Sequence, residues 1–125
     1  MTIWCTFLGL LTLLPTAAGS DALLVYSDES PRVFLGCLNC SKYDSSSVWN
    51  QYGDYGSAYS VTSMHNRFGL YGGKYSALSP CNAYTSTPPL VVDRDGNYYG
   101  RLTANRYRTD RFGSSVKVLA AICEE

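Results

Sequence analysis

Apolar residues in the first part of the chain occur in short runs separated by polar residues. Residues 22–26 and 32–36 are each rich in Val, Leu and aromatic side chains, and the polar residues 27–31 lie between them. Runs of this length and composition are typical of β-strands. The pattern therefore predicts two strands joined by a polar turn.

A second pair of apolar runs, residues 90–93 and 97–103, flanks an Asp95-Gly96 dipeptide. Gly96 can adopt the positive φ that a tight turn requires, so this stretch predicts a β-hairpin. The final run, residues 114–125, could be a helix that begins after Ser114 or a last strand. Its Leu-Ala-Ala-Ile sequence at 119–122 favours the helix.

Between these two strand pairs the pattern repeats every 16 residues, as 41–56, 57–72 and 73–88. A fixed period indicates stacked units that bury a shared face. The expected fold is a small, β-rich α+β domain, in which three 16-residue repeats of turns or short helices pack on a small antiparallel sheet. Residues 22–36 and 88–108 would form that sheet. Four equivalent positions are occupied by Tyr43/Tyr59/Tyr75, Ser47/Ser63/Ser79, Asn50/Asn66/Asn82 and Tyr52/Phe68/Tyr84.

Within one repeat, residues 45–52 are predicted to form one or two helical turns, with a Ser at the N-cap and Gly53 after the C-terminus. The glycines at fixed positions, Gly53/Gly69 and Gly56/Gly72, indicate either positive φ or close approach of neighbouring coils. Periodic Tyr and Asn positions are more often packing positions than binding residues.

Residues 1–20 have the layout of a secretory signal peptide, with an apolar run followed by small residues. The run is too short to span a bilayer of about 30 Å, so no stable membrane anchor is predicted. A buried N-terminal helix is the alternative. The expected mature protein is a single domain of residues 21–125, secreted or periplasmic.

Charge gives little indication of a partner, because ten basic and ten acidic residues leave a formal net charge of zero. A neutral total provides no general attraction to nucleic acid or to an anionic membrane, so nucleic acid is not predicted as a partner. Basic residues do cluster near one acid, Asp110. This cluster is more typical of a solvated face than of an anion site, and it consists of Arg101, Arg106, Arg108 and Arg111.

Cysteine is the most specific chemical feature, since four cysteines follow the predicted signal peptide: Cys37, Cys40, Cys81 and Cys123. An even number in a small exported domain favours structural disulfides, with the pairing left open. The alternatives are a Cys-x-x-Cys redox centre, a four-cysteine zinc site and free thiols. No doubly wound βαβ pattern follows Cys37 and Cys40, as a redox centre would need, and the zinc site lacks a second close pair. No metal or cofactor is predicted.

The remaining candidates for catalysis or metal binding are weak. His65, the only histidine, occupies the repeat position of Trp49 and Cys81, which favours a packing role. No serine lies in a nucleophile motif. Residues 93–97 are similar to the start of a calcium loop but lack its final acid, which favours the hairpin. No catalytic residue is predicted.

Three motifs together resemble a group of small, uncharacterised exported bacterial proteins. They are the Cys-Leu-Asn-Cys motif within residues 33–43, the Asn-x-Tyr-Gly-x-Tyr-Gly repeats, and residues 88–100. The resemblance covers about residues 33–107 and implies no activity. Proteins of that group usually have Trp where this chain has His65 and Cys81.

The sequence therefore favours a non-catalytic binding or interaction module with a surface rich in Tyr, Asn and Arg. Rigid amphipathic rings contact a large area at low entropic cost, so a protein or a carbohydrate is the expected partner. A thiol–disulfide oxidoreductase built on Cys37 and Cys40 is the alternative. The candidate surface residues are Tyr43, Tyr55, Tyr59, Tyr71, Tyr75, Arg101, Arg106 and Arg108.

Overall fold

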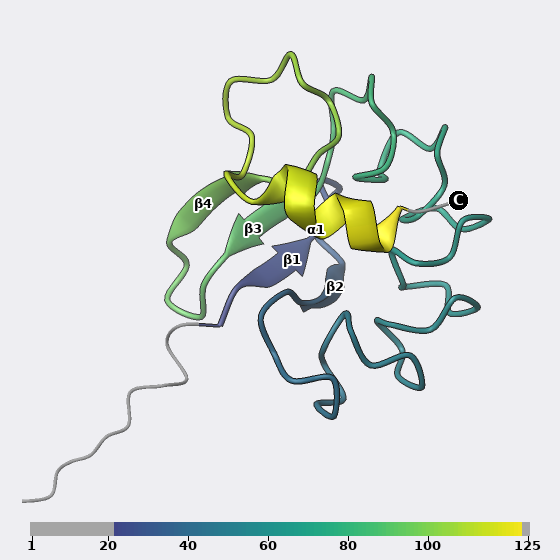
Figure 1. Cartoon of the computed structure of the whole chain (residues 1–125). Helices are drawn as coiled ribbons and strands as arrows, with labels where there is room; N and C mark the ends of the chain where they lie inside the picture. The colour runs from purple at the N-terminus through teal and green to yellow at the C-terminus, as the bar shows by residue number, and fades with distance from the viewer. Residues whose placement is uncertain (1–21, 124–125) are drawn as a thin grey trace, which may run out of the picture.

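The computed structural model describes residues 22–123, which form four short strands, one helix and a long run of turns (Figure 1). The small, sheet-rich fold expected from the sequence is confirmed. The predicted signal peptide lies outside the described residues. The elements are β1 (Leu24–Tyr26), β2 (Phe34–Cys37), β3 (Leu90–Val92), β4 (Tyr98–Arg101) and α1 (Ser115–Ile122).

The four strands form one antiparallel sheet in the order β2-β1-β3-β4. Val25 of β1 pairs with Gly36 of β2 on one side and with Val91 of β3 on the other, so the sheet joins both predicted strand pairs. The predicted hairpin is confirmed as β3 and β4. Gly96 has a φ of 88°, and Asp93 accepts hydrogen bonds from turn amides.

The core lies between the sheet and α1, which crosses in front of the sheet in Figure 1. Fully buried Val25 and Val91 pack in one cluster with Leu119 and Ile122 of α1. The 3-residue spacing of these two helix residues places them on one face. The predicted helix after Ser114 is confirmed, although the Ser114 side chain makes no capping hydrogen bond.

Between β2 and β3 the chain makes consecutive three-residue turns, and we call residues 41–87 the turn segment. The amides of Asp44, Ser47, Asn50 and Gly53 donate to the carbonyls three residues before them, at 2.9–3.3 Å. Other amides bond to the side chain two residues before them, as Trp49 N does to Ser47 Oγ at 3.0 Å and Phe68 N does to Asn66 Oδ1 at 3.0 Å. Side chains therefore supply much of the bonding that holds this segment.

An additional residue enters the run of turns at two places that lie 16 residues apart. Ser57 N donates to Gly53 O and Gly73 N donates to Gly69 O, each across four residues instead of three. Four steps of three residues and one step of four residues add up to the 16-residue period of the sequence.

The prediction of helical turns at residues 45–52 is wrong, because no helix occurs in the turn segment. Ser47 Oγ and Asn50 Oδ1 each accept a hydrogen bond from the amide two residues later, which gives the backbone an alternative to helical bonding. Short polar side chains compete with helices in this way. The side chains that suggested caps therefore hold separate turns.

The repeated glycines serve close approach rather than positive φ. Gly53 and Gly69 have no positive φ, and the described glycines that do are Gly36, Gly96 and Gly100. A Cβ on Gly56 would lie 2.1 Å from Asn50 O, and one on Gly72 would lie 2.4 Å from Asn66 O. Only glycine fits against the backbone at these two positions.

The four cysteines form two disulfides, as predicted, and their pairing is one local and one long-range. Cys37 pairs with Cys40, and Cys81 of the turn segment pairs with Cys123 after α1. Both are typical of proteins in an oxidising compartment. Among residues 22–123, no helix has the length and apolar character needed to cross a membrane.

Candidate functional site

Three asparagines at 16-residue intervals hold the turns in the same way. Asn66 donates from Nδ2 to Ser60 O at 3.1 Å, and its Oδ1 accepts from Phe68 N at 3.0 Å. Asn50 and Asn82 make the equivalent pair of bonds with the residues six before and two after them. These amides are committed to the backbone, which places the asparagines in the framework of the site.

The side chains three and two residues before each asparagine face inward. Ser47, Ser63 and Ser79 are fully buried. The next residue of each set is buried as well, and it is Val48, Met64 or Pro80. Val48 and Met64 belong to the same core cluster as the sheet and α1. The inward side of the turn segment therefore packs on the rest of the domain.

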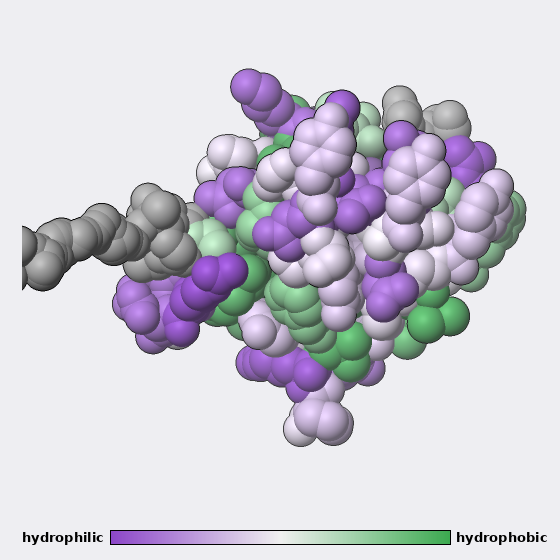
Figure 2. All heavy atoms as spheres, turned by 90° about the horizontal axis from the view of Figure 1, so that it is seen from below, coloured by the Kyte–Doolittle hydropathy of each residue, from purple (hydrophilic) through white to green (hydrophobic). Residues whose placement is uncertain are grey.

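The outward side carries two rows of exposed rings, which we call the ring rows. The first row is 83–91% exposed and consists of Tyr43, Tyr59 and Tyr75. The second is 84–93% exposed and includes Tyr52, Phe68 and Tyr84. Figure 2 shows pale rings that stand out from one face of the molecule among hydrophilic residues. Such exposure leaves a large aromatic area in contact with solvent.

Tyr107 is a further exposed ring that follows an asparagine, and the 16-residue register did not indicate it. Asn105 accepts from Tyr107 N and donates to Thr85 O, so it repeats the bonding of the three earlier asparagines. The Tyr107 ring is 79% exposed. The hairpin of β3 and β4 shifts it out of the 16-residue register. An Asn-x-Tyr/Phe motif without a fixed spacing would have found it.

Two of the predicted surface tyrosines point into the molecule. Tyr71 is only 7% exposed and donates its hydroxyl hydrogen to Glu29 Oε2. Burial and this hydrogen bond to a carboxylate raise the pKa of Tyr71 to about 12. Tyr55 is half-buried and packs edge-on against Phe34, with ring centroids 4.9 Å apart. Neither belongs to the ring rows.

The predicted surface arginines also differ in their exposure and in the partners they bond. Arg101 lies beside Asp28, with Nη1 to Oδ2 at 2.7 Å, and also donates to Pro88 O. Arg108 forms a two-pronged pair with Asp110, and the hydrogen bonds from Arg108 lower the pKa of that carboxyl below its ordinary value. Arg106 is exposed. Two of the four arginines in the basic cluster, Arg101 and Arg108, are therefore paired with acids.

An open groove of about 950 Å³ lies between two successive 16-residue stretches and α1. Tyr59 and Phe68 of the ring rows stand at it, and Ala121 and Ile122 of α1 close its far side. A second hollow of about 400 Å³ adjoins it, because Trp49 and Gln51 line both. Tyr43 and Tyr52 stand at this second hollow.

Half-buried Trp49 and His65 line the groove, with ring centroids 6.0 Å apart and planes inclined by 73°. Trp49 Nε1 donates to Leu38 O at 2.6 Å. His65 Nε2 lies 2.7 Å from Val48 O and donates to it, because a carbonyl oxygen only accepts. These bonds fix both rings, so the floor of the groove is preorganised. The repeat position indicated their packing role but not the groove.

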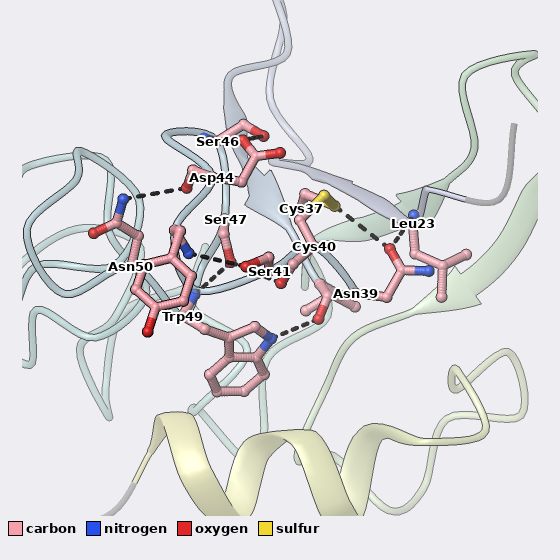
Figure 3. The surroundings of a disulfide bond; sticks show 12 residues. Leu23, Cys37, Asn39, Cys40, Ser41, Asp44, Ser46, Ser47, Trp49 and Asn50 are labelled. Carbon is pink, nitrogen blue, oxygen red and sulfur yellow. Dashed lines mark hydrogen bonds between the residues drawn. A yellow bond between two sulfur atoms is a disulfide. The ribbon is translucent and has the colours of Figure 1, made fainter. Parts of the chain in front are cut away.

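The Cys37–Cys40 loop lies directly behind this floor, and Figure 3 shows the Trp49 indole between the loop and α1. Cys37 is fully buried, whereas Cys40 is partly exposed. Asn39 Oδ1 accepts a hydrogen bond from Leu23 N at 2.8 Å, which ties the loop to β1. The disulfide therefore supports the position of Trp49 through the Leu38 carbonyl.

Within the part of the chain that the structure describes, no group of three or more His, Cys, Asp or Glu residues is arranged to hold a metal ion. Besides the Trp49 indole and the His65 imidazole, the polar side chains that line the groove carry amides, hydroxyls and the Arg67 guanidinium. Comparisons with protein-family models, with curated proteins and with solved structures find no match to this chain.

Proposed function

We propose that this protein is a non-catalytic binding module whose three 16-residue repeats form one unit, packed on the sheet, that presents the ring rows to a ligand. The observation that carries the proposal is the exposure of six rings, between 83% and 93%, at matching positions of residues 41–88. Tyr107, which follows Asn105 in the same way, is a seventh exposed ring.

Aromatic rings held outward on a fixed backbone suit recognition. Each ring has only two side-chain torsions to fix on binding, so it contributes a large contact area at low entropic cost. The backbone beneath Tyr52, Phe68 and Tyr84 is held by the asparagine bonds to their own amides. The rings are therefore positioned before a ligand arrives, which reduces the cost of binding.

The proposal can be tested by retention of the purified protein on solid phases of defined chemistry: cellulose, chitin, xylan, gelatin and polyproline-agarose. We expect the wild type to be retained on at least one phase. The variant Tyr52→Ser/Phe68→Ser/Tyr84→Ser should fold and pass through. If the variant and the wild type behave alike on every phase, the ring rows are not a binding surface.

We further propose that the module acts outside the cytoplasm, as a secreted or periplasmic protein of residues 21–125. Both disulfides agree with an oxidising compartment. The intact mass of protein recovered from the medium or the periplasm tests this. A mass that begins at or near Asp21 supports export, and a chain that retains Met1 contradicts it.

A second candidate function is thiol–disulfide exchange, which the local Cys37–Cys40 bridge favours. A partner thiolate would attack the partly exposed Cys40 sulfur and release Cys37 as a thiolate. A second thiol of the partner would then displace Cys40, leaving two reduced cysteines and an oxidised partner. A reduction potential of about −120 to −200 mV for this bridge would support exchange, and one below about −300 mV would show a structural bridge.

A further inference from the structure

The groove and the adjoining hollow offer the most defined binding site on the proposed surface. Together they run along the first two 16-residue stretches, and Trp49 and Gln51 line both. Gln51 is exposed, and its amide makes no side-chain hydrogen bond within residues 22–123. A free amide presents two donors and an acceptor to a ligand that lies across both hollows.

The ring of Tyr59 is distinguished from its equivalents by the residue before it. Lys42 Nζ lies 5.5 Å from the ring centroid of Tyr43, and Lys74 Nζ lies 6.0 Å from that of Tyr75. Ala58 occupies the equivalent position before Tyr59 and lines the groove with it. A ligand can therefore reach the Tyr59 face without displacing a lysine.

The donors at the floor of the groove are already used. Trp49 Nε1 and His65 Nε2 donate to the carbonyls of Leu38 and Val48. An extended peptide carries a carbonyl at every residue and loses affinity when these are left unpaired on binding. A sugar ring instead places its C–H face on an aromatic ring and keeps its hydroxyls at the rim, where water and Gln51 can bond them.

The charge of the lining selects against cationic ligands and offers an anionic ligand only two basic side chains. Among residues 22–123, the two hollows are lined by no acidic side chain, and their basic residues are Arg67 in one and Lys42 in the other. Arg67 is engaged in an interaction within the protein. A strongly charged ligand would find few groups to neutralise it.

We infer that the groove binds a neutral oligosaccharide chain, with one sugar ring stacked at Tyr59 and Phe68 and the next reaching the hollow of Tyr43 and Tyr52 through Gln51. This inference rests on the proposed binding function and assigns it a ligand class. The ligand spans adjacent repeats, so a hexasaccharide should bind more tightly than a disaccharide of the same sugar.

Trp49 provides the readout, because a chain that begins at Asp21 contains it as the only tryptophan. Its fluorescence is titrated with cellohexaose, chitohexaose, maltohexaose and decaproline. We expect at least one hexasaccharide to shift the emission. Tyr59→Ala should weaken that binding roughly fivefold to tenfold, as expected for the loss of one stacked ring.

Tyr98→Ala is the matched control, since the exposed Tyr98 ring of β4 lies outside the ring rows and lines neither hollow. Its affinity should stay within about twofold of the wild type. Both variants should keep the unfolding midpoint of the wild type, because both rings are exposed. An equal loss of affinity in the two variants would overturn the assignment to the groove.

The other outcomes separate the ligand class from the binding function. If decaproline binds with the same dependence on Tyr59 and no sugar does, the oligosaccharide inference is overturned and the binding module stands. If no hexasaccharide shifts the emission at concentrations up to about 10 mM, the inference also fails. Retention on the solid phases then decides the binding function independently.

Discussion

Some tyrosines of the turn segment are buried or half-buried and others are exposed. Contacts with residues distant in the sequence decide which of them face inward. Glu29, in the loop between β1 and β2, accepts the Tyr71 hydroxyl, and Phe34 of β2 receives the Tyr55 ring. Tyr59 and Tyr75 meet no such partner and stay exposed. The two pairs occupy different positions of the 16-residue register, but the register alone does not say which position faces inward.

Tyr71 should make the protein sensitive to alkaline pH. Its pKa is about 12 in the folded protein and 10.0 when unperturbed. Between pH 10 and 12 the unfolded chain therefore releases this proton while the folded protein retains it. The contribution of Tyr71, on the order of 2 kcal/mol, is complete below pH 10 and is lost as the pH rises through this range.

We expect the free energy of unfolding to fall less between pH 9.5 and 11.5 in Tyr71→Phe than in the wild type, because the phenylalanine variant has no proton to release there. Urea unfolding at a series of pH values measures this. Tyr59→Phe, at an exposed ring, is the control and should follow the wild type. Parallel curves for Tyr71→Phe and the wild type would contradict the raised pKa.

The two glycine positions of each 16-residue stretch should respond differently to alanine. A Cβ at Gly56 would lie 2.1 Å from Asn50 O, whereas the closest backbone atom to a Cβ at Gly53 is 3.3 Å away. We expect Gly56→Ala to destabilise by about 1–3 kcal/mol, as overpacking does. Gly53→Ala should stay within about 1 kcal/mol of the wild type. Equal unfolding midpoints for the two variants would contradict this packing.

At the scale of elements, the hairpin and the turn segment show what a sequence pattern can predict. The hairpin was predictable because Asp95-Gly96 specifies a turn and the residues beside it form strands. The turn segment was mispredicted because the prediction was based on the 16-residue period alone. Its shorter period, a Ser, Asp, Asn, Gly or Thr at nearly every third residue, was present in the sequence. Such side chains favour separate turns over a helix.

The asparagine bonds should contribute measurably to the stability of the turn segment. Asn66→Ala leaves Ser60 O and Phe68 N without their side-chain partner, so we expect a loss of about 1–3 kcal/mol in the free energy of unfolding. Gln51→Ala, which removes an exposed amide with no bond within residues 22–123, should stay within about 0.5 kcal/mol. Comparable losses in both variants would show that the asparagines are not structural.

The ring rows and the groove were only partly predictable. The 16-residue register indicated Tyr43, Tyr59 and Tyr75, and all three are exposed. The groove depends on α1 packing beside Trp49 and His65, which come from a segment distant in the sequence. The pairing of the cysteines could not be predicted either, since four cysteines allow three pairings.

At the scale of the molecule, the Cys81–Cys123 disulfide connects the turn segment to the end of α1 across 42 residues of sequence. The enclosed chain includes β3, β4 and the whole of α1. A constraint on so long a loop reduces the conformational freedom of the unfolded chain much more than the Cys37–Cys40 bridge, which closes three residues.

Removing the two disulfides separately should show this difference. By the chain-entropy estimate, Cys81→Ala/Cys123→Ala lowers the free energy of unfolding by about 4 kcal/mol, and Cys37→Ala/Cys40→Ala lowers it by about 2 kcal/mol. Guanidinium unfolding of both double variants provides the measurement. A larger loss from the local bridge would show that its support of Trp49 outweighs the loop it closes.

The division of the turn segment into inward serines, bonded asparagines and outward rings has a consequence for how such a protein can diversify. Mutations at the seven exposed ring positions remove no hydrogen bond made by those side chains within residues 22–123, and they leave the core intact. Selection for a new ligand can therefore act on these positions with little risk to folding. The segment is in this respect similar to an antibody paratope, with a constant framework and variable contact residues. A library randomised at Tyr43, Tyr52, Tyr59, Phe68, Tyr75, Tyr84 and Tyr107 should contain mostly folded members that differ in what they bind.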